Sequence, residues 1–501
     1  MNRDGKINRA LCAAAIILLI ASLMPVMYCA LSDYATGDDF GKSYMVRRVI
    51  KNGGNIIEIL KAGADGAYEA YVSNEGTWAS NFILAMQPGV WGERVYAVTP
   101  FIGLFFLGIG TGMFIYELMV RVWGFSKRAF WFLWPLFFAL MIQCMPYIKG
   151  GLFWHPGMAH YDIPFAAALI FTVWMMRYFR TGKKKYVPLL LLISVYLGGS
   201  HYQAMLLGWL SLVFLAVYAG YAKKTGRGQA AVAGLCVLIQ FVGFYFCYKA
   251  PGNNARAEAQ FSFTAERAVD AVKESVIQSS ADGIGYLAGT RWVFIFAVLV
   301  FMIGAALHDE QRFRGPWKYA VWIVYSYLTY CAMYAPGLYY NTYGAALDLS
   351  GGYYDVNYYT FLLFVLFAAL LTGNAAGNML GKKSFFAGRI RGIVNAGMVC
   401  IAVFCVLFNR HLVGRTTDRI CADYITSGAL ADFRVQMEER LAILEDDSIR
   451  DAVVPQMNDD QGPIMHMALT EDRNAFTNWA ASLYYGKDSI VAVPRDEYCA
   501  Q

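Results

Sequence analysis

Two adjacent carboxylates, Asp38 and Asp39, follow the first long apolar run of a chain in which only 16% of the residues are charged. One of them can cap a helix that is predicted to begin near Phe40, because Asp is a favoured N-cap residue and a carboxylate suits the positive end of a helix. A single cap uses only one acid, and ionisable residues beside a membrane are costly and tend to be functional. The doublet is therefore a candidate catalytic pair. It would accept a proton from an attacking hydroxyl, or bind a divalent cation such as Mg²⁺ or Mn²⁺.

A second candidate is the stretch APGNNAR at residues 250–256, directly after an apolar run. Pro-Gly-Asn-Asn is strong turn chemistry and can aim successive backbone N–H groups at an anion. An arginine adds a forked, permanently charged contact for phosphate. Asn253, Asn254 and Arg256 are thus predicted to bind an anion such as a phosphate. The alternative is that the turn only ends the apolar run and that Arg256 meets lipid headgroups.

Two of the six histidines lie in one short connection, residues 149–160. Their spacing with Asp162 matches no metal-binding pattern, so lining a substrate site is favoured over a metal centre. Trp78 belongs to an aromatic stretch that favours a membrane interface, as an anchor or as a platform for a lipid-linked substrate. His201, in a short turn, is alternatively a helix cap. The residues predicted to line the substrate site are His155, His160, Tyr161, Asp162, His201 and Trp78.

The elements that position these residues must suit a membrane, because 58% of the residues are hydrophobic and the mean hydropathy is positive. A bilayer core is about 30 Å thick and requires a helix of roughly 20 apolar residues. Two of the apolar windows, at 186–200 and 292–307, are short for a bilayer. The eleven predicted windows are 10–31, 96–117, 129–148, 161–179, 186–200, 203–222, 229–248, 292–307, 319–335, 358–374 and 392–409.

Lys and Arg concentrate in alternate short segments along the chain, including the run Lys183-Lys184-Lys185. Positive residues in short loops are held on the cytoplasmic side of a membrane. The pattern predicts a multi-pass protein of the cytoplasmic membrane with its amino terminus inside and, after eleven crossings, its carboxyl terminus outside. The formal net charge of +6 is explained by loops that touch anionic membrane lipids, so nucleic acid is not expected as a partner.

Three outer segments are long enough to fold: residues 32–95, 249–291 and 410–501. The first two are predicted to hold helices at the membrane surface, as parts of a transmembrane domain that spans residues 1–409. The third segment is richer in acids and combines helical spacing with a short β-prone piece. It predicts a small extracytoplasmic α/β cap.

Cofactor motifs are not apparent. The sequence contains no nucleotide-binding loop and no CxxC pattern, and most of its ten cysteines fall in apolar windows. Cys421 and Cys499, in the third outer segment, allow a disulfide without requiring one.

The layout resembles the GT-C superfamily of integral-membrane glycosyltransferases, with a long first span, an outer loop opening on paired acids, about ten further spans and an outer tail. It is also similar to a group of bacterial polytopic membrane proteins that share three motifs. Here they read Gly37-Asp38-Asp39-Phe40, Ala250-Pro251-Gly252-Asn253-Asn254-Ala255-Arg256 and Tyr484-Tyr485-Gly486. The resemblance implies an all-α polytopic fold of about eleven transmembrane helices and an acidic catalytic residue in the first outer loop.

The resemblance further implies transfer of a sugar from a polyprenyl-phosphate donor to an envelope glycan, polymer or lipid acceptor, with inversion at the sugar carbon. Asp38 or Asp39 would act as base or metal ligand, and Arg256 would hold the phosphate. Two other classes stay open. A transporter or flippase for an envelope precursor would place charges near the bilayer midplane. A non-catalytic assembly protein would use the outer segments for protein contacts.

Overall fold

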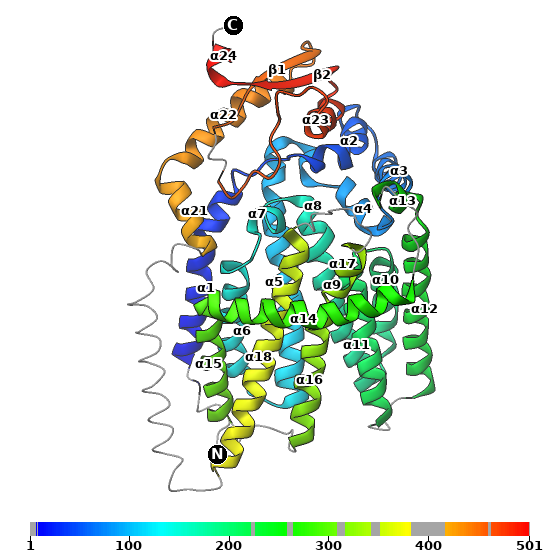
Figure 1. The fold of residues 1–501 in the computed structure, drawn as a ribbon, viewed down its shortest axis with the longest axis vertical. Helices are drawn as coiled ribbons and strands as arrows, with labels where there is room; N and C mark the ends of the chain where they lie inside the picture. The colour runs from blue at the N-terminus through cyan, green and yellow to red at the C-terminus, as the bar shows by residue number, and fades with distance from the viewer. Residues whose placement is uncertain are drawn as a thin grey trace.

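The chain folds into a bundle of roughly parallel helices with a smaller mixed element seated on one end (Figure 1). We call this end, which carries the last helices and strands of the chain, the cap end. The computed structural model describes residues 7, 9–221, 226–257, 264–307, 316–341, 351–381, 416–458 and 462–499.

A helix lies at each of the first ten predicted apolar windows, and the eleventh window, 392–409, lies outside the described residues. The two windows predicted to be short are short, since α10 has 12 residues and α15 has 16. The bundle helices are α1 (Arg9–Ala30), α5 (Thr99–Tyr116), α6 (Lys127–Gln143), α9 (Ile163–Thr181), α10 (Val187–Gly198), α11 (Tyr202–Tyr221), α12 (Arg227–Lys249), α15 (Arg291–Ala306), α16 (Pro316–Ala332) and α18 (Gly351–Gly381).

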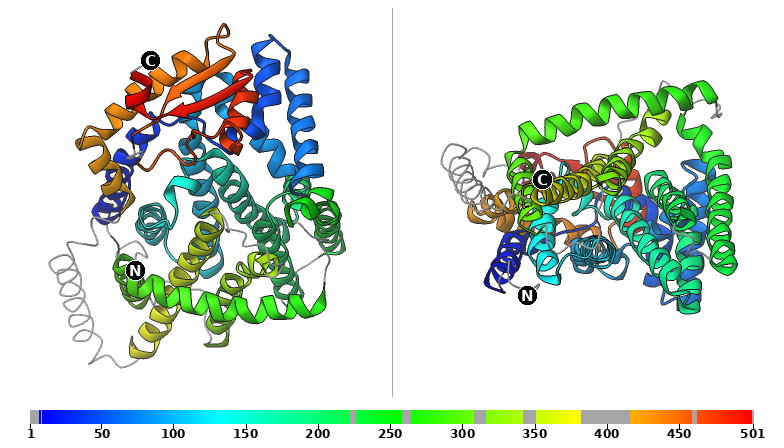
Figure 2. Two further views of the ribbon diagram at one scale, coloured as in Figure 1. Left: turned by 45° about the horizontal axis from the view of Figure 1, so that its top comes forward. Right: turned by 90° about the horizontal axis from the view of Figure 1, so that it is seen from below.

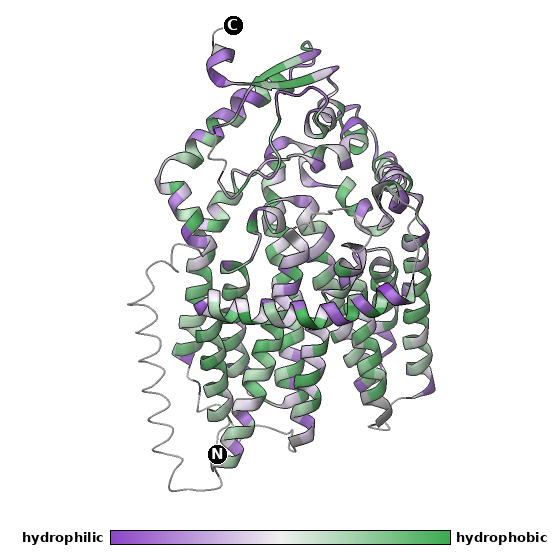
Figure 3. Cartoon of the chain, viewed as in Figure 1, coloured by the Kyte–Doolittle hydropathy of each residue, from purple (hydrophilic) through white to green (hydrophobic). Residues whose placement is uncertain are grey.

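The bundle has the character of a membrane protein. Among the described residues, five helical stretches are long and apolar enough to cross a membrane, or up to six if the pair α14 (Ala265–Gly289) and α15, bent by 92°, counts as one span. Apolar residues dominate the bundle away from the cap end, whereas polar residues are more frequent toward it (Figure 3). The predicted helical, membrane-type architecture is confirmed. The five stretches are Arg9–Ala30, Glu93–Trp123, His155–Thr181, Arg227–Lys249 and Gly351–Met379.

Between α1 and α5 the chain forms three helices at the cap end: α2 (Asp38–Lys51), α3 (Ile56–Ser73) and α4 (Trp78–Ala85). Gly53, at φ +74°, ends the turn after α2. Asn55 then starts α3, because its side chain accepts hydrogen bonds from the backbone N–H groups of Ile57 and Glu58. Two short 3₁₀ helices complete the segment, η1 (Pro88–Trp91) and η2 (Glu93–Val98).

The stretch predicted as a Pro-Gly-Asn-Asn turn is instead a short helix, α13 (Pro251–Ala257). Proline suits the first position of a helix, since its fixed φ is already helical and its missing N–H has no intrahelical partner there. The surface helix expected in the same segment is α14, which crosses the bundle helices along one side (Figure 2).

The remaining short elements join the bundle helices. They are η3 (Glu117–Trp123), α7 (Ile148–Gly151), α8 (His155–Gly157), η4 (Met158–Asp162), η5 (Lys184–Tyr186) and α17 (Ala335–Asn341), of which η3 and η4 are wider π-helical turns.

The described part of the carboxyl-terminal segment, residues 416–458 and 462–499, contains a two-stranded parallel sheet in which Val453 pairs with Val491. We call it the cap. Cys421 lies against α1, with the Cys29 thiol 3.7 Å from its carbonyl oxygen, whereas Cys499 belongs to the last helix. The cap elements are α21 (Thr417–Thr426), α22 (Ala429–Leu444), β1 (Asp451–Pro455), α23 (Phe476–Tyr485), β2 (Ser489–Val493) and α24 (Arg495–Cys499).

The cap is attached to α2 by an apolar cluster and by an ion pair between a buried arginine and a half-buried glutamate. The Phe40 ring lies between Tyr484 and Tyr485, at centroid distances of 5.1 and 5.5 Å. The Arg47 guanidinium donates to Glu445 at 2.5 Å and to the backbone carbonyl of Gly89 at 3.1 Å. The buried rings, and the hydrogen bonds that compensate for burial of the Arg47 charge, fix α2 and with it the acidic doublet against the cap.

Candidate functional site

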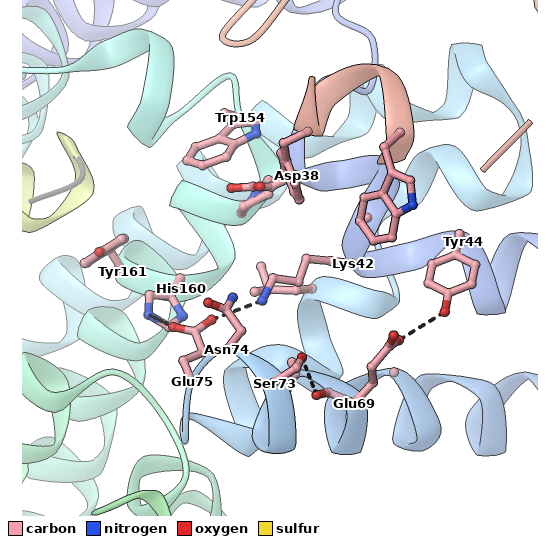
Figure 4. Close-up of a pocket in the computed structure, with 17 residues that line it drawn as sticks. Asp38, Lys42, Tyr44, Glu69, Ser73, Asn74, Glu75, Trp154, His160 and Tyr161 are labelled. Carbon is pink, nitrogen blue, oxygen red and sulfur yellow. Dashed lines mark hydrogen bonds and ion pairs between the residues drawn. The ribbon is translucent and has the colours of Figure 1, made fainter. Parts of the chain in front are cut away.

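A polar cavity of about 480 Å³ lies at the cap end, between α2, α3, the turn before α9 and α23 (Figure 4). Its volume falls in the range of small-molecule sites, about 300–1,000 Å³. Asp38 and Trp154 lie together on one side, and Lys42, Glu75 and His160 face them from the other (Figure 4). The cavity is lined by Asp38, Gly41, Lys42, Tyr44, Gly66, Glu69, Ala70, Ser73, Asn74, Glu75, Leu84, Trp154, Pro156, His160, Tyr161, Phe476 and Trp479.

The acidic doublet is split by the first turn of α2. Successive residues of an α-helix point about 100° apart, so Asp38 lines the cavity and is half-buried, while Asp39 is fully buried inside the protein. The turn before them depends on Gly37, at φ +56°. A Cβ at that position would lie 2.6 Å from the Met467 side chain.

Asp39 is held by two hydrogen bonds to the same oxygen. Its Oδ2 accepts from the backbone N–H of Thr36 at 2.9 Å and from the Tyr96 hydroxyl at 2.8 Å. Burial raises the pKa of Asp39 well above its usual range, and these hydrogen bonds offset only part of the rise. Asp39 is fully buried and its Oδ2 is used by Thr36 and Tyr96, so Asp39 is a positioning residue and Asp38 is the acid that faces the cavity.

The turn before Asp38 is also hydrogen-bonded to a cap segment without regular secondary structure. We call this segment, residues 464–470, the strap. The Thr36 hydroxyl donates to the carbonyl of Met467 in a short contact, and the Met467 N–H donates back to that hydroxyl at 3.2 Å. Trp154 Nε1 donates to the Thr36 carbonyl at 3.4 Å. The position of Asp38 is therefore set by segments far away in the sequence.

A row of charged groups crosses the cavity opposite Asp38. Lys42 Nζ lies 3.2 Å from Glu75 and 2.9 Å from the amide oxygen of Asn81. The other carboxylate oxygen of Glu75 lies 4.0 Å from His160 Nε2. This arrangement places the Lys42 amino group and the His160 imidazole within the same cavity as Asp38, where they can face a bound anion.

His160 and Tyr161, two of the predicted substrate-lining residues, line the polar cavity. His201 does not line it but packs against both in tilted and edge-on geometry, with ring centroids 4.9 Å from His160 and 4.3 Å from Tyr161. As the alternative reading of the sequence expected, His201 precedes the first turn of α11, and its carbonyl accepts from the Ala204 N–H at 3.1 Å.

His155 and Asp162 were predicted to line the substrate site, but both are buried in the described structure and neither lines the polar cavity. The backbone N–H of His155 donates to the Tyr96 hydroxyl at 2.8 Å, which makes this residue part of the support behind Asp39. Both lie in the segment that turns into α9, and a helical turn sends only some of its side chains to one face. The sequence could not show which ones.

Trp78 lines a different cavity. This apolar cavity of about 1130 Å³ lies on the opposite face of α3 and α4 from the polar one and is bounded by bundle helices. The α3 and α4 pair thus forms a wall between the two cavities. The apolar cavity is lined by Ala64, Ala67, Tyr68, Tyr71, Trp78, Ala79, Phe82, Ile83, Phe106, Ile109, Met113, Ile163, Ala167, Ile170, Trp174, Leu192, Ile193, Val195, Tyr196 and Phe246.

The predicted phosphate site at APGNNAR is not formed as expected. The amide of Asn253 is used by the protein itself: Nδ2 donates to the carbonyls of Cys247 and Tyr248, and Oδ1 accepts from the Gly76 N–H at 3.1 Å. Asn253 is therefore a buried link between the end of α12 and the start of α4. Asn254 is exposed and does not line the polar cavity, and the side chain of Arg256 lies outside the described residues.

The doublet does not fit a metal ion held by both acids, since only Asp38 faces the cavity and Asp39 Oδ2 is committed to Thr36 and Tyr96. Among the described residues, no three His, Cys, Asp or Glu side chains are grouped so that they could hold a metal.

Sequence reasoning missed Lys42, Glu75 and Trp154 as residues of the site. A signal for Lys42 was present, because residues four apart share one face of a helix and Lys42 follows Asp38 at that spacing. Glu75 and Trp154 lie in irregular connections, for which periodicity gives no direction.

No protein-family model matches this chain, and no curated protein or solved structure is significantly similar to it.

Proposed function

We propose that this chain is a membrane glycosyltransferase with a GT-C-like layout of about eleven spans, working on the outer face of a cytoplasmic membrane. It moves a sugar from a polyprenyl-phosphate donor to an acceptor of the cell envelope.

The observation that carries the proposal is the adjacency of two unlike cavities. The polar one contains Asp38, Lys42 and His160, and the apolar one, about 1130 Å³ in volume, is lined almost entirely by aliphatic and aromatic side chains. His160 is only three residues from Ile163, which lines the apolar cavity. A donor with a sugar phosphate on a long isoprenoid chain matches such a pair, because each part is transferred into surroundings of its own polarity.

In the proposed reaction the acceptor hydroxyl attacks the anomeric carbon of the donor sugar. A bond forms between the acceptor oxygen and that carbon while the bond from the carbon to the phosphate oxygen breaks, and the phosphate leaves with the electron pair. Asp38 takes the proton of the hydroxyl. Lys42 and His160 face the developing charge on the phosphate.

The groups around Asp38 hold it in place during this step. Tyr96 and Thr36 fix Asp39, and the strap and Trp154 fix the turn that precedes Asp38. A reacting group held in its working geometry avoids an entropic cost in the transition state. No covalent intermediate on the protein is needed for a single displacement.

A carrier for an envelope precursor is the second candidate, favoured by Asp162 and Asp355. Both carboxylates are fully buried within helical stretches that are able to cross a membrane. Ionisable residues inside a membrane mark transport pathways in many proteins. This candidate predicts that Asp162→Asn and Asp355→Asn abolish movement of the precursor, whereas Asp38→Asn leaves it intact.

The test uses purified full-length protein in lipid nanodiscs, radiolabelled polyprenyl-phosphate hexoses and envelope extract. We expect label to move into the acceptor fraction and Asp38→Asn to lower the rate by about 10²- to 10⁴-fold, the usual contribution of a general base. Asp65→Asn on the exposed side of α3 is the matched control and should retain the wild-type rate. An unchanged rate with Asp38→Asn, or no transfer from any donor by the wild-type protein, would refute the proposal and leave a carrier or an assembly role.

A further inference from the structure

The cap contributes two large aromatic side chains to the wall of the polar cavity. Phe476 and Trp479 of α23 are 48% and 50% exposed, although the same helix buries Tyr484 and Tyr485 almost completely. Residues three apart share one face of a helix, and the two ring centroids are 6.0 Å apart. Exposure of two neighbouring aromatic rings at the rim of a cavity is typical of a binding surface.

Polar groups accompany these rings in the cavity. Tyr44 and Glu69 line the same cavity, and the Tyr44 hydroxyl donates to Glu69 Oε2 at 3.1 Å. The carboxylate can accept further hydrogen bonds from a ligand, since an ionised carboxylate offers about four acceptor sites. A cavity that combines aromatic rings with carboxylate and hydroxyl groups fits a pyranose ring, which has an apolar face and hydroxyl groups at its edge.

The position of this aromatic wall relates it to the acceptor rather than to the donor. His160 lines the polar cavity and Ile163, three residues later, lines the apolar one, so a lipid-linked donor would lie at the end near the start of α9. Phe476 and Trp479 come from the cap, which supplies none of the residues that line the apolar cavity. Asp38, the proposed base, lines the same cavity.

We propose that Phe476 and Trp479 form a carbohydrate-stacking wall of an acceptor subsite, and that the acceptor is a glycan chain. The assignment of this wall to the acceptor rests on the proposed glycosyl transfer. Carbohydrate binding at the wall does not, and it can be measured without any transfer.

Trp479 is the cleaner position for substitution. Phe476 also packs against α2, where a Cβ on Gly41 would lie 3.5 Å from the Phe476 ring, so its removal would alter the junction of α2 and α23. Trp479→Ala removes the stacking surface, Trp479→Leu keeps an apolar side chain without a ring, and Trp479→Phe keeps a ring. The matched control is Trp91→Ala in η1, because Trp91 is 49% exposed and does not line the cavity.

In the binding test, wild-type protein and variants in nanodiscs are titrated calorimetrically with soluble methyl glycosides and disaccharides of glucose, galactose, mannose, N-acetylglucosamine and rhamnose. We expect at least one sugar to bind the wild type and Trp91→Ala equally. Trp479→Ala and Trp479→Leu should weaken that binding roughly tenfold, and Trp479→Phe should restore most of it. Binding that is unaffected by Trp479→Ala, or a wild type that binds none of these sugars, would overturn the proposal.

In the transfer test, the same variants are assayed with the acceptor fraction and the donor varied separately. We expect Trp479→Ala to raise the KM for the acceptor roughly tenfold and to leave the KM for the donor unchanged. If Trp479→Ala is active and its KM for the acceptor is unaltered, or if the radiolabel enters only protein or lipid, the glycan subsite is overturned. The proposed glycosyl transfer would stand in both cases. Glycan binding that depends on Trp479 in a protein without transfer activity would instead overturn the enzymatic function and keep the carbohydrate site.

Discussion

At the scale of single residues, two adjacent acids have different surroundings because one helical turn directs them to different sides. Asp38 reaches a cavity open to ligands, and Asp39 enters a buried network with Thr36 and Tyr96. The two identical carboxylic acid side chains therefore have two different roles. Burial raises the pKa of Asp39, and its Oδ2 accepts hydrogen bonds from both of these neighbours.

The two roles predict opposite results for two substitutions of Asp39. Asp39→Asn keeps an oxygen that can accept from Thr36 and Tyr96, so transfer activity and the thermal midpoint should stay close to the wild-type values. Asp39→Ala leaves these donors unpaired in the interior and should lower the free energy of unfolding by about 1–3 kcal/mol for each lost partner. Thermal unfolding in detergent and the radiolabel assay would check both. Loss of transfer in Asp39→Asn, with the thermal midpoint unchanged, would show that this acid takes part in the reaction.

At the scale of elements, the strap connects the cap to the turn of the acidic doublet. His466 in the strap lies 3.1 Å from the Tyr147 hydroxyl, and its ring centroid is 4.1 Å from that of Trp154. Burial, with the nearby positive charge of Lys149, lowers the pKa of His466 to about 4. The imidazole is therefore neutral in the folded protein at pH 7.

This shift predicts acid lability of the cap end. The unfolded imidazole titrates near pH 6.5, so between about pH 6.5 and pH 4 the unfolded state binds more protons and stability falls as the pH is lowered. We expect the drop in thermal midpoint from pH 7 to pH 5 to be smaller in His466→Phe, which keeps a ring against Trp154 but cannot be protonated. Burial raises the pKa of Asp39, so this residue instead makes the folded protein more stable as the pH falls. Asp39 is present in both proteins, so its contribution cancels when the two drops are compared. Equal drops would argue against a buried neutral His466.

The contact of α21 with α1 predicts a specific cross-link. The Cys29 thiol lies 3.7 Å from the carbonyl of Cys421 and interacts with the Cys421 thiol, so the two sulfur atoms are neighbours, whereas Cys499 lies in α24. Mild oxidation with copper phenanthroline should join Cys29 to Cys421, and peptide mass spectrometry would identify the pair. Cys29→Ser should abolish the cross-link and Cys499→Ser should not. A bridge between Cys421 and Cys499 would contradict the packing of the cap on α1.

At the scale of the whole molecule, the two cavities share a wall but differ in polarity, and their adjacency depends on helices from several parts of the chain. The apolar cavity is bounded by α3, α4, α5, α9, α10 and α12. A bulky side chain in it should impair use of the lipid part of the donor and leave the reacting groups unchanged.

Ala64 is exposed on α3 and lines the apolar cavity, so Ala64→Trp should fill part of it without disturbing the core. Displacing two or more methylene groups of the isoprenoid, at about 0.8 kcal/mol each, should raise the KM for a long-chain donor at least tenfold. A donor with a short isoprenoid chain should be used as by the wild type. Asp65→Trp, exposed on the same helix and outside the cavity lining, is the control. An equal effect on long and short donors would show that the apolar cavity does not receive the lipid.

The sequence by itself determined where the membrane-type helices lie and that the acidic doublet deserves a functional interpretation. Both depend on local composition, since a helix satisfies its own backbone hydrogen bonds and needs only an apolar surface of sufficient length. The short β-prone piece at Ala452–Pro455 was likewise visible as a strand, β1, because its residue types favour extended chain.

Only the tertiary structure decided which acid faces the cavity and which predicted residues gather there. Asp39 is held by Tyr96, and Thr36 is held by Met467 from the far end of the chain. Asn253 was expected to bind phosphate, but its amide satisfies backbone groups of other segments. Hydrogen bonds and cavity walls of this kind join residues that are distant in sequence, so local periodicity and motif spacing carry no information about them.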